Sequence, residues 1–326
     1  MDVPSLINKL AEATRDVSSS DRYSLYPIQD EKTFFYVNKH ISTVWTNIEM
    51  NYSEDKRDFL TLLPHQRRIV SLILAFFSSA DGVILNNLAF RFILEAKTLE
   101  EKSFYIVQQF MELIHSEAYS LAINSLISDP EERERLFRAA DTHPTVKRKN
   151  EFMEKYLFSS LEKPYRLVAF ACAEGIFFIS AFLIVFWFRV IGKLNVLIFL
   201  NEQVSKDETL HRDFAVHLFR MHGAESKKVQ DIVREAVEIE IDFIRDVLEV
   251  EEEDLTVKQS INYIHRLGNR LLYDMGVEEI FPEEGELPTW MQNISRQQKA
   301  NLYEVRGGNY RTRGAEDFNY AVDDDF

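Results

Sequence analysis

The sequence predicts an all-helical fold organised as one large domain. Apolar residues recur at helical spacing through most of the 326 residues, and no stretch alternates convincingly between apolar and polar residues. The chain contains only 10 Gly and 8 Pro, so tight turns and Gly-rich nucleotide-binding loops are scarce. A hydrophobic content of 46% supports a sizeable core in a chain of this length. These observations argue against sandwich folds and favour long packed helices.

Helical segments follow one another along the chain and are separated by residues that begin or end helices. Pro64 suits a first helical turn, the pair Asp129-Pro130 interrupts a helix, and Gly223 suits the residue after a helix end. The segments that we expect are 30–45, 64–95, 99–126, 130–140, 144–157, 164–190, 194–221, 225–250 and 255–273.

The two ends of the chain differ in character from the helical region. Residues 1–20 have no long apolar stretch, and we expect them to form a flexible N-terminus. Residues 21–290 are expected to form the single helical domain. Helix breakers gather toward Pro288, and residues 291–326 are polar, so we expect a flexible C-terminal tail that ends in the aromatic residue Phe326.

Charge and cysteine content restrict the partners and the compartment. The 38 basic and 53 acidic residues give a net charge of −15, which disfavours a nucleic-acid partner. The single cysteine, Cys172, can form neither an internal disulfide nor a cysteine-based metal cage. Because residues 1–21 also lack the pattern of a secretory signal, we expect a cytoplasmic protein.

One stretch is apolar enough to raise the possibility of a membrane span. Residues 167–188 carry a single charge, Glu174, and are long enough to cross a bilayer. A mid-span carboxylate is costly, and we expect no second stretch of this kind. The interpretation that we favour is a helix buried on all sides inside a bundle, with no membrane association. In either case the Glu174 carboxylate needs a partner.

Two E-x-x-H pairs are candidates for metal ligation. Glu112 and His115 form the first pair, and Glu208 and His211 form the second. Residues three apart lie on one helix face, so each pair can direct a carboxylate and an imidazole toward one point. Taken singly, each pair is better explained by ordinary helix-face acids and satisfied core histidines.

An isolated acid precedes each pair at nearly the same distance. Asp81 lies 31 residues before Glu112, and Glu174 lies 34 residues before Glu208. Both acids stand in apolar helical segments, where an unpaired carboxylate is costly and a shared cation would remove that cost. Two lone acids and two E-x-x-H pairs on four helices are the ligand set of ferritin-like bundles with a dinuclear metal centre in the core. Carboxylates and imidazoles without thiolates suit iron or manganese.

Four motifs carry a resemblance to a known family. They resemble the metal-ligand motifs of the small, radical-generating subunit of class I ribonucleotide reductase, in its eukaryotic and viral form. The likeness extends from about Arg22 to Phe326. The motifs are Ala-Phe-Phe-Ser-Ser-Ala-Asp-Gly at 75–82, Met-Glu-Leu-Ile-His-Ser-Glu-Ala-Tyr at 111–119, Glu-Gly-Ile-Phe-Phe at 174–178 and Ser-Lys-Asp-Glu-Thr-Leu-His at 205–211.

The resemblance implies a role for each residue of the candidate centre. The centre would hold two iron ions, with manganese as the alternative. The tyrosine four residues after His115, Tyr119, would be oxidised to a stable neutral radical in a dry apolar pocket, which Phe178 and Phe182 are placed to wall. The six implied metal ligands are Asp81, Glu112, His115, Glu174, Glu208 and His211.

The resemblance also implies a route for the oxidising equivalent and two protein partners. Asp207 would accept a proton from the His115 ring, and Trp45 would extend this chain toward the surface. Tyr310 matches the redox tyrosine of the tail, and Tyr303 and Tyr320 stay as alternatives. The protein would form a homodimer, and its acidic terminus, Ala321–Phe326, would dock on a separate large subunit.

The function implied is that of the small subunit of ribonucleoside-diphosphate reductase. The dimetal centre would activate dioxygen and generate the tyrosyl radical, which passes to the large subunit for reduction of ribonucleotides to deoxyribonucleotides. Two alternatives stay open. The first is a ferroxidase or another dimetal oxidase, which would leave Tyr119, Trp45 and the tail without a common purpose. The second is a metal-free structural partner of a radical subunit, although all six ligands are present.

Overall fold

The structure is a computed structural model that describes residues 23–157 and 159–292. In these residues the regular secondary structure is helical apart from one isolated bridge between Glu252 and Leu255. The predicted all-helical class is therefore confirmed. The elements are α2 (Glu31–Ser42), η1 (Asn47–Glu49), α3 (Ser53–Thr61), α4 (Pro64–Asn87), η2 (Leu88–Phe92), α5 (Ile93–Glu95), α6 (Leu99–Leu126), α7 (Pro130–Phe137), α8 (Ala139–Thr142), α9 (Pro144–Leu157), α10 (Lys163–Cys172), η3 (Ala173–Phe178), α11 (Ile179–Trp187), α12 (Asn195–His222), α13 (Ser226–Val247) and α14 (Val257–Met275).

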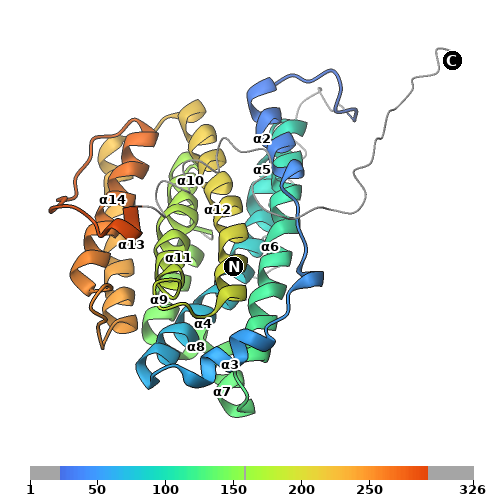
Figure 1. Ribbon diagram of the computed structural model, residues 1–326. Coiled ribbons are helices and arrows are strands. Elements are labelled where there is room, and N and C mark those ends of the chain that lie inside the picture. The colour runs from blue at the N-terminus through green and yellow to red at the C-terminus, as the bar shows by residue number, and fades with distance from the viewer. Residues whose placement is uncertain (1–22, 158, 293–326) are drawn as a thin grey trace, which may run out of the picture.

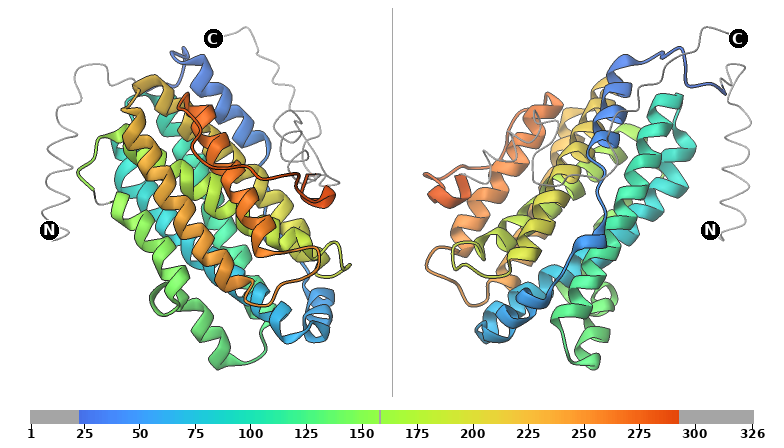
Figure 2. Two further views of the ribbon diagram at one scale, coloured as in Figure 1. Left: turned by 90° about the vertical axis from the view of Figure 1, so that its left-hand side faces the viewer. Right: turned by 45° about the vertical axis from the view of Figure 1, so that its right-hand side comes forward.

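The long helices lie side by side as a bundle. Helix α4 packs against α6, α10 packs against α12, and α13 packs against α14. In Figure 1 the orange helices α13 and α14 lie on one side, and α2 and α6 lie on the other, with α10, α11 and α12 between them. The two views of Figure 2 show the long helices running along a common direction. The buried side chains of the central helices form one continuous core.

Local sequence signals explain where the main helices begin. The side chain of Thr98 accepts a hydrogen bond from the backbone N–H of Glu101, which caps the start of α6. Pro64 occupies the first turn of α4, where its missing N–H costs nothing. Helices α6 and α9 have the bounds that the sequence predicts. The short helix α3 was not predicted.

The expected helix over 164–190 is interrupted. Helices α10 and α11 are joined by the π-helical segment η3, and a second π-helical segment, η2, follows α4. A π turn holds one more residue than an α turn, so it changes which side chains face the core beyond it. Glu174 lies within η3, in the part of the chain that faces the centre of the bundle.

Two helical stretches are long and apolar enough to cross a membrane. They are Lys163–Trp187 and Pro64–Glu95, so the prediction that no second such stretch exists was wrong. The most apolar window of Lys163–Trp187 is completely buried inside the protein, and that of Pro64–Glu95 is 67% buried. Such burial is typical of the core helices of a bundle, which is the interpretation favoured for residues 167–188.

Candidate metal centre

Four neighbouring segments bring the six predicted ligands into the core. Helix α4 carries the lone aspartate, η3 carries the lone glutamate, and α6 and α12 each carry an E-x-x-H pair. None of the six side chains is exposed to solvent. The residues are Asp81, Glu112, His115, Glu174, Glu208 and His211.

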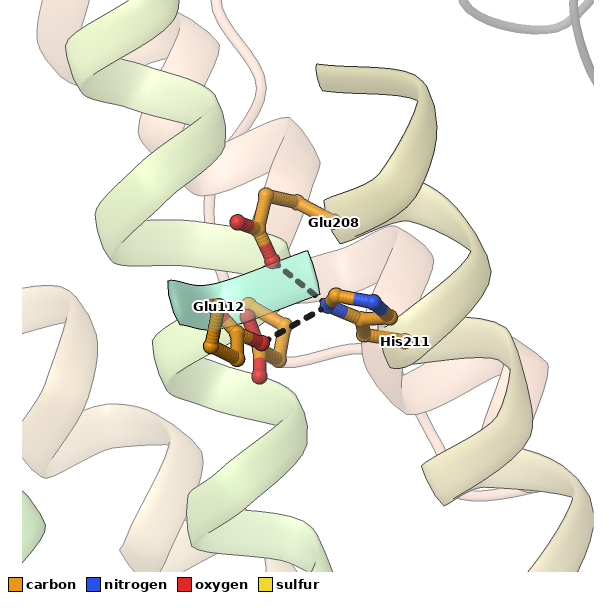
Figure 3. A group of neighbouring side chains, drawn as sticks. Glu112, Glu208 and His211 are labelled. Carbon is orange, nitrogen blue, oxygen red and sulfur yellow. Dashed lines mark hydrogen bonds and ion pairs between the residues drawn. The ribbon is translucent and has the colours of Figure 1, made fainter. Parts of the chain in front are cut away.

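The donor atoms of four of these residues lie within 4.8 Å of one another. The four are Glu112, Glu174, Glu208 and His211. Figure 3 shows the ring of His211 directed between the carboxylates of Glu112 and Glu208. Its Nδ1 lies 3.0 Å from Glu112 Oε1 and 2.9 Å from Glu208 Oε2. The arrangement can therefore present one nitrogen and several oxygens to a single cation.

His115 adjoins the same carboxylates from α6. Its Nδ1 lies 3.0 Å from Glu208 Oε1 and 3.4 Å from Glu112 Oε2. The other ring nitrogen, Nε2, lies 3.1 Å from Asp207 Oδ2. If Nε2 donates its proton to Asp207, Nδ1 presents a lone pair to the carboxylates. A nitrogen lone pair that faces carboxylate oxygens indicates a position for a cation between them.

Several buried oxygen and nitrogen atoms of this cluster have no hydrogen-bond partner in the described part of the chain. Natively folded proteins leave few buried polar atoms unsatisfied, and each one requires a reason. Bound cations would satisfy all of these atoms together, and oxygen and nitrogen donors without sulfur suit iron or manganese. The atoms are Asp81 Oδ1 and Oδ2, Glu112 Oε2, His115 Nδ1, Glu174 Oε2 and Glu208 Oε1. The residues present therefore fit a dinuclear centre.

The pKa shifts in this cluster show that it is stabilised by positive charge. Burial raises the pKa of Asp81 well above its usual range, and the charge of Glu112 adds to this effect. Burial, followed by Glu208 and Glu112, raises the pKa of Glu174 in the same way. Burial alone would lower the pKa of His211, but the two glutamates outweigh it and raise that pKa to about 9. Without metal, protons must supply the positive charge.

Gln108 joins the two glutamates of this cluster. Its Nε2 donates to Glu112 Oε1 and to Glu174 Oε1, each at 3.2 Å. Gln108 was not predicted, although it lies four residues before Glu112 and hence on the same face of α6. It fixes one oxygen of each carboxylate and leaves the other oxygen available.

The Tyr119 side chain is fully buried beside the cluster. Its hydroxyl donates a hydrogen bond of 3.3 Å to Asn201 Oδ1, and its ring stacks on Phe77 with centroids 4.4 Å apart. Phe178 and Phe182, which were expected to wall Tyr119, stack on Phe77 with ring centroids 5.8 and 5.1 Å away. The ring that stacks on Tyr119 is Phe77. Burial, reinforced by the charge of Asp81, raises the pKa of the Tyr119 phenol well above its usual value. The phenol is therefore protonated at neutral pH.

Phe77 and Asn201 were not predicted, although spacing could have found them. Phe77 lies four residues before Asp81, and Asn201 lies seven residues before Glu208. Both intervals place the residue on the face of its helix that carries the predicted ligand.

Asp207 connects the centre to an indole. Asp207 Oδ2 accepts hydrogen bonds from Trp45 Nε1 at 2.8 Å and from His115 Nε2 at 3.1 Å. Trp45 and His115 are also stacked, with ring centroids 5.8 Å apart. The structure thus brings these three predicted residues together.

The remaining predicted residues lie outside the described residues. These are the candidate redox tyrosines and the terminal peptide, Tyr303, Tyr310, Tyr320 and Ala321–Phe326.

Comparisons with known proteins agree with this geometry. Residues 22–288 match the family "Ribonucleotide reductase, small chain". The chain is 38% identical to the ribonucleoside-diphosphate reductase small chain of Nicotiana tabacum over 296 residues, which cover 90% of each protein. It is 35% identical to the small chain of vaccinia virus (strain Ankara) over 311 residues, or 94% of this chain and 97% of the viral one.

A solved structure extends the comparison to three dimensions. The ribonucleotide reductase Rnr4 homodimer of Saccharomyces cerevisiae superposes with a TM-score of 0.75 and 28% identity. The match covers 90% of this chain and 96% of the yeast chain. The ferritin-like architecture is therefore shared with this relative, and the family match spans the helices that carry the predicted ligands. This chain belongs to the family of ribonucleotide reductase small chains.

Proposed function

We propose that this small chain of ribonucleoside-diphosphate reductase generates and stores a radical at Tyr119. The single observation that carries the proposal is the setting of Tyr119, a fully buried phenol placed between a carboxylate–histidine cluster and an aromatic wall. A ferroxidase would need the cluster alone. The enclosed tyrosine and the Trp45–Asp207 link support a radical role.

Two metal ions would be held by the six buried residues described above. We propose iron, with manganese as the alternative, because both suit a donor set of carboxylates and imidazoles. When bound, such a pair supplies the reduction of dioxygen and the oxidising equivalent for one-electron oxidation of a nearby phenol. The ligands are Asp81, Glu112, His115, Glu174, Glu208 and His211.

The residues around Tyr119 would hold the proton and exclude water. Asn201 Oδ1 accepts from the Tyr119 hydroxyl, which fixes the direction in which the phenolic proton points. Asn201 is itself held by a hydrogen bond of 2.7 Å from its Nδ2 to the carbonyl oxygen of Leu197. Phe77 covers one face of the phenol ring, so water reaches that face only if the Phe77 side chain moves.

The oxidising equivalent would leave by way of Asp207 and Trp45. Asp207 Oδ2 accepts from both the His115 ring and the Trp45 indole, so a single oxygen joins the centre to the aromatic residue. Tyr310, with Tyr303 and Tyr320 as the alternatives, would continue the route to a large subunit. Ala321–Phe326 would dock on that subunit.

The protein would act as a homodimer in the cytoplasm. Helix α6 presents an apolar surface, which we call the α6 face, formed by Ile106, Phe110 and Leu113 with exposed fractions of 54%, 46% and 56%. The three are spaced by four and three residues, so they lie on one side of the helix. A solvent-facing apolar row indicates a partner surface. The homodimer of the yeast relative supports a second copy of this chain as that partner.

Electron paramagnetic resonance tests the proposal. The protein is loaded with ferrous iron without oxygen and then exposed to oxygen, beside a Tyr119→Phe variant. A tyrosyl signal in the parent, and its loss in a variant that still binds two ions, is the expected result. Two bound ions without a signal in the parent would instead favour an oxidase. Absence of bound iron or manganese would remove the metal-dependent function altogether.

A further inference from the structure

A third buried histidine adjoins the two histidines of the proposed ligand set. His40 lies near the end of α2, its side chain has no exposure to solvent, and its Nε2 is 2.7 Å from His211 Nε2. The ring also packs against Phe104, with centroids 5.3 Å apart. We infer that His40 is a positioning residue that selects the tautomer of His211 and thereby tunes one of the two metal positions. The inference rests on the proposed function, because it requires bound cations.

The tautomers follow from the hydrogen-bonding rules of imidazole. Between two ring nitrogens 2.7 Å apart, one must donate and the other must accept. His211 Nδ1 faces Glu112 and Glu208, and it can bind a cation only through its lone pair. The proton of a neutral His211 is then on Nε2, which donates to His40. His40 accepts at Nε2 and carries its own proton on Nδ1.

The two proposed histidine ligands consequently donate hydrogen bonds to different acceptors. His115 Nε2 donates to the carboxylate of Asp207, whereas His211 Nε2 donates to a neutral ring. A carboxylate acceptor makes the donating imidazole a stronger metal ligand than a neutral acceptor does. The structure therefore assigns unequal ligand strength to the two histidines, with His115 the stronger donor.

The hydrogen bonds that orient both histidines depend on one short stretch of the chain. His40 reaches His211 directly, and Trp45, five residues later, reaches His115 through Asp207. The end of α2 and the residues that follow it therefore fix the rings of both histidine ligands. Displacement of this stretch would loosen both metal positions.

Two substitutions of His40, each by a side chain of similar length, separate its role as a hydrogen-bond acceptor from its role in packing. Glutamine at position 40 keeps an acceptor, and methionine fills similar space without a comparable one. Binding of Mn²⁺ in the absence of oxygen is measured from the electron paramagnetic resonance signal of the free ion. We expect two ions per parent chain, one of them about 10- to 100-fold weaker in His40→Met, and recovery to within several-fold in His40→Gln. Thermal unfolding of the metal-free variants checks the fold.

The outcomes separate this inference from the proposed function. If the parent binds no Mn²⁺ and no iron, the proposed function fails. If the parent and His40→Met bind two ions equally well, or if the two variants are equally weakened, only the role of His40 is overturned. Should His40→Met not fold, ¹⁵N NMR of histidine in the Zn²⁺-loaded parent decides. A His40 proton on Nδ1 supports the inference, and one on Nε2 overturns it.

Discussion

The indole Nε1 of Trp45 and the carboxylate oxygen Oδ2 of Asp207 are joined by a buried hydrogen bond of 2.8 Å. The same oxygen accepts from the Nε2 of His115, 3.1 Å away. One oxygen atom therefore links residues that are 70 positions apart in the chain, and the link begins at a histidine that we propose as a metal ligand.

Replacement of Trp45 by phenylalanine should separate radical formation from nucleotide reduction. The variant lacks the indole N–H, but Asp207 and His115 keep their contact, so metal content and the tyrosyl signal should match those of the parent. Deoxyribonucleotide formation with the large subunit should fall to background. Trp290→Phe is the matched control, because the Trp290 indole donates to the carbonyl oxygen of Asp254, away from the centre. Normal reduction by the Trp45 variant would disprove the route.

Truncation of Phe77 to alanine should shorten the lifetime of the tyrosyl signal. Loss of a buried phenylalanine ring costs about 3–5 kcal/mol of stability and opens a path for water to Tyr119. Decay of the resonance signal measures the lifetime, and urea denaturation measures the stability. Phe152→Ala should be similarly destabilising and leave the decay unchanged, because Phe152 packs on Tyr156 and Phe177. Equal decay in both variants would contradict a shielding role for Phe77.

The buried groups Asp81, Glu174 and His211 should contribute less stability to the metal-free protein as the pH rises above about 4.5. Folding raises the pKa of Asp81 and Glu174, so the native state retains protons that the unfolded chain releases. His211, with a pKa raised from 6.5 to about 9, acts in the same direction between those values. Stability from these groups is present at low pH and is lost as the pH passes through the folded pKa values.

Metal binding should therefore stabilise the protein more at pH 8.5 than at pH 6. The cation replaces the retained protons, and apparent affinity rises as proton competition falls. At a free concentration of 100 times the Kd, each ion adds about 2.7 kcal/mol. Thermal unfolding with and without Mn²⁺, under argon, checks the difference. The same metal-induced shift in Tm at both pH values would show that the cluster does not hold the protons.

Lys149 and Glu240 form a buried ion pair whose disruption should destabilise the fold. Lys149 Nζ lies 2.8 Å from Glu240 Oε2 and 3.4 Å from the centre of the Phe76 ring, and neither charged side chain is exposed. Lys149→Met leaves the Glu240 carboxylate without its cation and should cost about 3–5 kcal/mol in urea denaturation. Adding Glu240→Gln should recover most of this loss. An additive double variant would show that the two charges do not interact.

Charged substitutions on the α6 face should separate the proposed dimer. Phe110→Asp would place a carboxylate in the middle of the apolar row, where association must remove its water. Sedimentation velocity should show a dimer for the parent and a monomer for the variant. Leu60→Asp, at a residue of α3 that is 58% exposed, is the control and should stay dimeric. A dimeric Phe110 variant would place the interface elsewhere.

Much of the fold could be predicted because helical periodicity is a local property. The bounds of α6 and α9 follow from capping residues and from prolines that act within a few positions. The π turn in η3 could not be predicted in this way. Its extra residue is stabilised by packing against distant helices, which no local pattern records.

The site shows the same division between local and distant information. The E-x-x-H pairs can be recognised from the spacing of their residues along one helix. His40 has no such motif, and its role depends on a contact with a residue 171 positions away. A weaker signal did exist. Thr33, Val37 and His40 are the buried residues of α2 and are spaced by four and three residues, so the pattern places a histidine on the inward face.

The π segment around Glu174 makes the two lone acids mechanically different. Asp81 stands in a regular α-helix, whose repeating hydrogen bonds hold its backbone in one register. Glu174 stands where that repeat is broken, next to Gly175, at which any Cβ would come within 2.6 Å of Arg212 Cδ. Such π segments are rare and occur frequently at functional sites. In the proposed centre, the ligand on α4 would thus be held by a regular helix and the ligand on η3 by a segment whose repeat is broken, so we expect a change in metal–ligand distances to be absorbed at Glu174 rather than at Asp81.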